Sequence, residues 1–187
     1  MKFIFIVLFS WLTIGQAGQG QDLYVSKNVR VTIFSSALIE DIKAVTSSGV
    51  SVFNATTGEL DFSVAMSSFQ FEKAFMQQHF NTDYMESDKY PRAVFKGKIQ
   101  EHIDVTKDGI YTVNARGDLT VHGITHTRTI PGTITVKNGV ISMASEFMVK
   151  CTDHHIEIPQ ILFYHIAESI KATVSATYLS YKNNASK

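Results

Sequence analysis

Short runs in which apolar and polar residues alternate recur along most of this chain. In residues 59–66, the apolar side chains of Leu60, Phe62 and Val64 are each separated by one polar or small residue. Because successive side chains of a β-strand point to opposite faces, this period of two predicts a strand with one buried face. The same period occurs in residues 29–34, 111–121, 134–136, 147–149 and 170–176.

Turn signals separate these runs. They are Thr57–Gly58, the KDG sequence at 107–109 and the KNG sequence at 137–139. Asn, Asp and Gly tolerate the backbone conformations of tight hairpins. About eight strands joined by short turns predict an all-β antiparallel sandwich or barrel, and no repeated strand–helix–strand unit is present.

The composition narrows the class of protein. The chain has 187 residues and equal numbers of basic and acidic residues, 17 each, so its formal net charge is zero. Without a basic cluster it lacks the attraction that dominates nucleic-acid binding, and we expect no nucleic-acid partner. A single domain of this size can bury a core without disulfides, and the one cysteine, Cys151, has no partner within the chain.

The first 20 residues read as a secretory signal peptide. Lys2 precedes the apolar run 3–14, and Gly15 and Ala17 offer a small-residue cleavage site. The run is too short to cross a bilayer, which needs about 20 residues. We therefore expect cleavage, a single domain over residues 21–187, no stable membrane insertion afterwards, and a periplasmic or secreted protein.

Two segments depart from the strand pattern. Residues 72–84 place Phe75, Met76, His79 and Phe80 on one face of a predicted helix. In residues 153–166, Pro159 interrupts any strand beside an apolar stretch, which predicts a lid or a barrel plug.

Motifs for phosphate loops, nucleophile elbows or zinc proteases are absent from the sequence. His122 and His126, with His154 and His155, are the nearest approach to a metal or catalytic cluster. We expect no catalytic residues, no metal and no cofactor, and keep an enzyme or metal protein acting on a small amphiphile as the alternative.

Bulky apolar residues are the other marked feature, because the chain holds 13 phenylalanines. An eight-stranded barrel is either just filled by side chains or wide enough for one ligand. If Ala172, Val174 and Ala176 face inward opposite the phenylalanines, they leave a tunnel. Periodicity alone leaves both a ligand tunnel and a filled, ligand-free interaction module open.

Four ordered motifs resemble the YceI family. They are GELDF at 58–62, NTDYMESDKYPRAVF at 81–95, GDLTVHGITH at 117–126, and the segment from Phe147 through Asp153 to Pro159. The similarity extends from about Val29 to Tyr178.

This resemblance implies a lipocalin-like, extended eight-stranded antiparallel barrel capped by one or two short helices. It also implies export to the periplasm or beyond and a hydrophobic small molecule in the lumen, either an isoprenoid quinone, a polyprenyl lipid or a fatty-acyl lipid. The family offers no catalytic residues to carry over. We expect a monomer or a homodimer.

Candidate ligand contacts follow from this interpretation. The expected apolar lining comprises Phe62, Phe69, Phe71, Phe75, Phe80, Phe95, Tyr111, Phe147 and Phe163. The expected head-group contacts at the mouth are Arg92, His122, His126 and Arg128.

Overall fold

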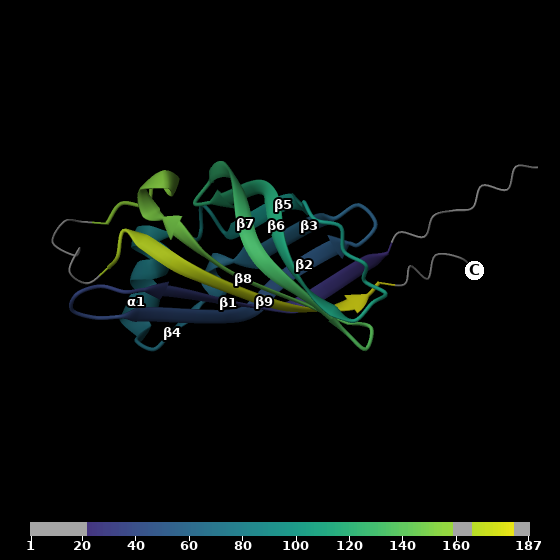
Figure 1. Ribbon diagram of the computed structural model, residues 1–187. Helices are drawn as coiled ribbons and strands as arrows, with labels where there is room; N and C mark the ends of the chain where they lie inside the picture. The colour runs from purple at the N-terminus through teal and green to yellow at the C-terminus, as the bar shows by residue number, and fades with distance from the viewer. Residues whose placement is uncertain (1–21, 159–165, 182–187) are drawn as a thin grey trace, which may run out of the picture.

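The computed structural model describes residues 22–158 and 166–181, which form an antiparallel barrel (Figure 1). Its eight wall strands are β1 (Leu23–Ser35), β2 (Ile42–Asn54), β3 (Glu59–Ala65), β5 (Arg92–Ile99), β6 (Gly109–Val121), β7 (Ile124–Lys137), β8 (Val140–Lys150) and β9 (Ser169–Ser180). They lie in the order β1-β9-β8-β7-β6-β5-β3-β2, and pairing of β1 with β2 closes the ring. The two-residue strand β4 (Gln70–Phe71) pairs with β2. The predicted all-β class and the eight-stranded antiparallel barrel are confirmed.

Two wall strands, β2 and β5, were not among the alternating runs found in the sequence. Strand β2 has the sequence IKAVTSSGVSVFN, in which serine and threonine dilute the apolar positions. It nevertheless pairs with β1 along most of its length and with β3 near its end. The pairing of two long neighbours therefore stabilises a strand whose own pattern is weak.

Tight turns connect several neighbouring strands. Asn138 and Gly139, with φ of 51° and 76°, join β7 to β8 as their sequence predicted. His122 and Gly123, with φ of 50° and 73°, make the same kind of turn between β6 and β7. Two successive positive φ values match the twist of a two-residue hairpin.

The helical segment is shorter than the expected 72–84. Helix α1 covers Ala74–His79 and is followed by a π-helical turn, η2 (Phe80–Tyr84). Lys73 has extended backbone angles, which explains why the helix starts later than expected. Two single turns complete the fold: η1 (Met66–Ser68) and η3 (Cys151–His154).

The two ends of the barrel differ. One end is packed, with Phe53, Ile134, Ile141 and Tyr178 almost fully buried and the Phe53 and Tyr178 rings in edge contact at 6.3 Å. Helix α1, η3 and the β1–β2 loop all lie at the opposite end (Figure 1). The fold thus has a packed end and an end covered by short helical elements.

Within the part of the chain that the structure describes, no helix is both long and apolar enough to span a membrane. The expected signal peptide, residues 1–20, lies outside that part and stays a prediction.

Candidate functional site

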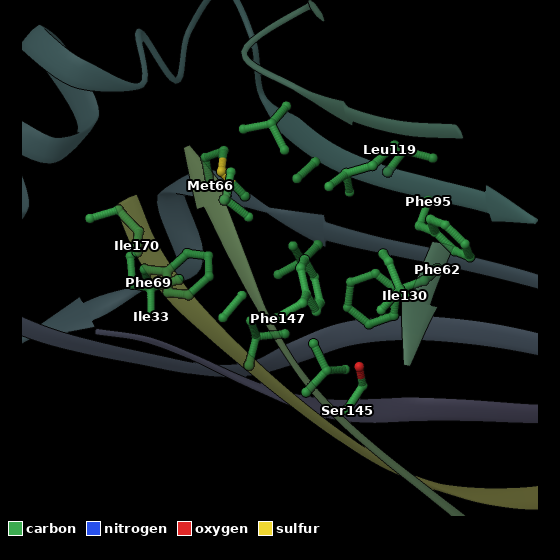
Figure 2. Close-up of a pocket in the computed structure, with 18 of the residues that line it drawn as sticks. Ile33, Phe62, Met66, Phe69, Phe95, Leu119, Ile130, Ser145, Phe147 and Ile170 are labelled. Atoms are coloured by element: carbon green, nitrogen blue, oxygen red, sulfur yellow. The ribbon is translucent and has the colours of Figure 1, made fainter. Parts of the chain in front are cut away.

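An internal cavity of about 770 Å³ occupies the barrel. Every one of the eight wall strands contributes side chains to it, and helix α1 adds more at one end. Figure 2 shows Phe62, Phe95 and Phe147 pointing into this space from three different strands. The barrel interior is therefore not filled by its own side chains.

The small side chains of β9 help to keep the cavity open. Ala172, Val174 and Ala176 all line it, which is the orientation that the tunnel interpretation required. An alanine leaves volume that a phenylalanine or leucine at the same position would occupy. The volume of the cavity therefore depends on small residues on β9 and aromatic residues on other strands.

Seven of the nine expected lining residues do line the cavity. They are Phe62, Phe69, Phe71, Phe75, Phe80, Phe95 and Phe147. The prediction for Tyr111 is wrong, because its hydroxyl donates to the backbone oxygens of Asp104 and Lys107, at 3.1 and 3.2 Å, in the β5–β6 connection. Phe163 lies outside the described residues.

The cavity is polar at only a few points. Towards the packed end, the Tyr178 hydroxyl donates to Ser51 Oγ at 2.7 Å, because the Ser51 hydroxyl itself donates to the backbone oxygen of Asp61 at 2.8 Å. Burial raises the pKa of Tyr178 to about 12, so this hydroxyl stays protonated. Both hydroxyl protons are therefore already hydrogen-bonded within the protein and need no polar ligand atom.

The end of the cavity beside helix α1, which we call the mouth, holds its acidic and basic side chains. Among the described lining residues, Glu40 and His79 are the only acidic or basic ones. His79 Nδ1 lies 2.5 Å from Asp83 Oδ2, and the pKa of Asp83 is lowered chiefly by this hydrogen bond. Glu40 forms an ion pair with Lys73, which precedes α1.

Sequence reasoning did not assign Glu40 or His79 to the site. His79 was identifiable, since it belongs to the apolar stripe of the predicted helix. Glu40 had no local signal, because its partner Lys73 is 33 residues away.

The four expected head-group residues do not reach the cavity. Arg92 donates from Nε to Ser63 Oγ at 2.7 Å on the neighbouring strand. His122 donates from Nδ1 to the backbone oxygen of His154 at 3.0 Å, and its Nε2 lies 2.9 Å from Glu86 Oε2. That expectation is corrected, and the Arg92 and His122 side chains bind other protein groups instead.

His126 and Arg128 belong to the same part of the molecule. His126 donates from Nε2 to the backbone oxygen of Asp153 at 2.7 Å. Arg128 has a buried Nη1 without a hydrogen-bond partner. Neither side chain contributes to the cavity lining.

The histidines considered for the alternative, a metal or catalytic cluster, thus form a structural contact between η3 and the β6–β7 hairpin. The rings of His126 and His154 meet at right angles with centroids 5.2 Å apart, and His154 Nδ1 donates to the backbone oxygen of Ile124 at 3.1 Å. His155 sits at the end of η3 with φ of 53°. Over residues 22–158 and 166–181, no group of three or more His, Cys, Asp or Glu side chains is arranged to hold a metal ion.

Part of the expected lid lies beside the cavity. Ile156, Ile158 and Ile166 line it, while residues 159–165 lie outside the described residues. Cys151, at the start of η3, also lines it, and burial, aided by Glu168, raises the pKa of its thiol to about 11. A thiol held protonated is a poor nucleophile.

Comparisons with known proteins agree with this architecture. A family model described as a YceI-like domain matches residues 19–178. A search of curated proteins finds no match.

Solved structures with the same fold include proteins from three different organisms. A polyisoprenoid-binding domain from Saccharophagus degradans, implicated in plant cell wall breakdown, aligns with a TM-score of 0.73 at 12% identity, covering 86% of this chain and 99% of that one. Burkholderia cenocepacia BcnA aligns with a TM-score of 0.67 at 15% identity, covering 80% and 95%. A Campylobacter jejuni YceI protein aligns with a TM-score of 0.60 at 19% identity, covering 78% and 88%. At these identities the similarity shows the shared fold.

Proposed function

The chain belongs to the YceI-like domain family, and we propose that it is an exported, non-catalytic carrier that holds the apolar chain of an isoprenoid or similar lipid inside its barrel. The observation that carries this proposal is the cavity of about 770 Å³, whose lining is predominantly apolar. Cavities of roughly 300–1,000 Å³ are the usual size of small-molecule sites.

The energetics favour a long hydrocarbon chain. Each methylene transferred from water into such a lining contributes about 0.8 kcal/mol. A chain of several isoprene units therefore needs no polar partner along its length. Among the residues that the structure describes, the lining supplies aromatic and aliphatic contacts but no free charge between Ser51 and the mouth, which supports an uncharged chain there.

The distribution of polar groups supports one orientation of the ligand. We expect the tail to point towards the packed end, where the Ser51 and Tyr178 hydroxyls are already paired. The polar head would lie at the mouth, near His79 and Glu40. An isoprenoid quinone or a polyprenyl lipid has this division into a long apolar chain and a small polar head.

Two further observations support the ligand class and the location. The Saccharophagus degradans domain that shares this fold is described as polyisoprenoid-binding. Residues 1–20 have the features of a secretory signal peptide, which supports export. No cofactor or catalytic residue is part of the proposal.

The proposal is tested with variants in which larger side chains on β9 reduce the volume of the cavity. Ala172→Phe with Ala176→Phe places two large rings in the lumen, whereas Thr173→Phe with Thr177→Phe places the same rings at the same spacing on the other face of β9. Binding of a long-chain isoprenoid quinone is measured by displacement of a fluorescent polyene lipid.

We expect the inward pair, Ala172→Phe with Ala176→Phe, to lower the quinone affinity by at least about tenfold, since the new rings occupy volume that the isoprenoid chain of the quinone would fill. The outward pair keeps the affinity of the unaltered protein. Circular dichroism confirms folding of each pair, and the single variant Ala176→Phe replaces the inward pair if that does not fold. Unchanged affinity in a folded inward variant would overturn the proposal.

A further inference from the structure

Exposed apolar side chains gather where the cavity opens. Leu38 and Ile39, in the loop between β1 and β2, are 84% and 64% exposed. Phe75, on α1, is 56% exposed and also lines the cavity. We call these three residues the rim. Water-exposed side chains of this size at one place mark a surface that meets another apolar phase.

The rim is held together across two elements. Glu40 directly follows Ile39 and forms an ion pair with Lys73, two residues before Phe75. The β1–β2 loop and α1 consequently lie at the same end of the barrel (Figure 1). The loop tip and the helix therefore present their apolar side chains together.

Charged residues around the rim show no basic excess. Glu40 is paired with Lys73, and Asp83 is hydrogen-bonded to His79. The remaining neighbours in sequence, Asp41, Lys43 and Glu72, add up to a charge of −1. A surface without basic excess has no attraction for anionic lipids, so the complementary partner is an electrically neutral one.

We propose that the rim docks on a zwitterionic lipid bilayer, so that a lipid passes between the membrane and the cavity along Phe75. This inference rests on the proposed carrier function. Leu38 and Ile39 enter the interface, and Phe75 gives a lipid chain apolar contact from the bilayer to the lumen. Insertion of exposed apolar side chains into the interfacial region drives such binding without charge attraction.

The experiment measures flotation of the purified protein with phosphatidylcholine vesicles. The rim variant carries Leu38→Ser and Ile39→Ser, neither of which lines the cavity. The matched control carries Ile110→Ser and Leu179→Ser, which are 76% and 74% exposed on strands β6 and β9 near the packed end.

We expect the rim variant to lower the vesicle partition coefficient by at least roughly tenfold and the control to leave it unchanged. Binding should be insensitive to salt and should not rise when anionic lipid is added. Equal flotation of the rim variant and the unaltered protein, or loss of flotation only in the control, would overturn the proposal. Concentration-dependent dimerisation that the rim variant abolishes would also overturn it, since a second copy would then cover the rim.

A second measurement separates docking from lumen binding. Isoprenoid quinone is delivered from ethanol, with no vesicles present, to both variants. We expect equal quinone affinity in both, because their altered side chains lie outside the lumen. Absence of quinone binding together with intact flotation would contradict the carrier function but not membrane docking. Lowered quinone affinity in the rim variant alone would show that the rim also takes part in binding the lipid, which would contradict separate roles for the rim and the lumen.

Discussion

At the scale of single residues, two glycines let strands β5 and β6 approach closely. Gly97 and Gly117 are directly paired. A Cβ atom on Gly117 would lie 2.2 Å from the backbone oxygen of Lys96 and 2.3 Å from Cα of Gly97. Backbone atoms cannot turn aside as a flexible side chain can, so only glycine fits here. The glycine that opens the GDLTVHGITH motif thus has a packing role.

Gly117→Ala should therefore destabilise the barrel. We expect the free energy of unfolding to fall by about 1–3 kcal/mol, because the new methyl group forces the two strands apart. Urea unfolding measures the change. Gly109→Ala serves as the control, since the atoms nearest to its Cβ belong to the Tyr111 side chain, at 3.4 Å. Equal loss of stability in both variants would show that close approach is not the reason for Gly117.

Residue orientation was predictable, but depth along the barrel was not. Tyr111 has the same parity on β6 as Val113 and Leu119, which line the cavity. Tyr111 lies two residues from the start of the strand, at the packed end, where the space is filled and its hydroxyl bonds to the adjoining loop. Alternation identifies a face of a strand and carries no information on where along that face a cavity ends.

At the scale of elements, η3 bridges a gap in the barrel wall. Strands β7 and β8 pair only from Thr133 with Ala144 to Lys137 with Val140. Beyond Ala144 the strands separate, and η3 joins the end of β8 to the β6–β7 hairpin through the hydrogen bonds of His122, His126 and His154. Side-chain bonds thus replace the ladder that the two strands do not make.

The contact between η3 and the β6–β7 hairpin should stabilise the protein less in mild acid. His154 is fully buried, and burial lowers its pKa from the usual value of about 6.5. The unfolded chain then binds a proton more readily than the folded one, so the free energy of unfolding should fall as the pH drops below about 6.5. Urea unfolding at pH 7 and pH 5 measures this slope.

Two variants test whether His154 causes this pH dependence of the free energy of unfolding. His154→Gln should flatten the dependence between pH 7 and pH 5, whereas His155→Asn, at the adjacent position with a left-handed backbone, should retain it. Asp83 and Glu101 have lowered pKa values and titrate below this range. An unchanged slope in His154→Gln would locate the acid sensitivity elsewhere.

The elements themselves were predictable to different degrees. Strands with strong alternation, such as β3, emerged from the sequence almost at their observed bounds. The Ser- and Thr-rich β2 did not, because its stability comes from its neighbours. His122 and His126 were interpreted as head-group contacts because local spacing cannot show that their nitrogens bond to backbone oxygens about 30 residues away.

At the scale of the whole molecule, the barrel combines a packed end with a hollow, apolar interior. The buried Phe53, Ile134, Ile141 and Tyr178 close one end, while Glu40, Phe75 and His79 border the other. An empty apolar cavity forgoes the contacts that its lining would make with a ligand. A bound lipid chain would recover them, which is the central physical reason to expect a cargo in this fold.

Native mass spectrometry of the protein purified without detergent tests this claim most directly, with organic extraction to identify any bound molecule. The account predicts a stoichiometric adduct of prenyl or acyl type, carried through purification or acquired on incubation with an isoprenoid quinone. A mass equal to that of the bare chain, unchanged after incubation with isoprenoid quinones, polyprenyl lipids and fatty acids, would contradict it.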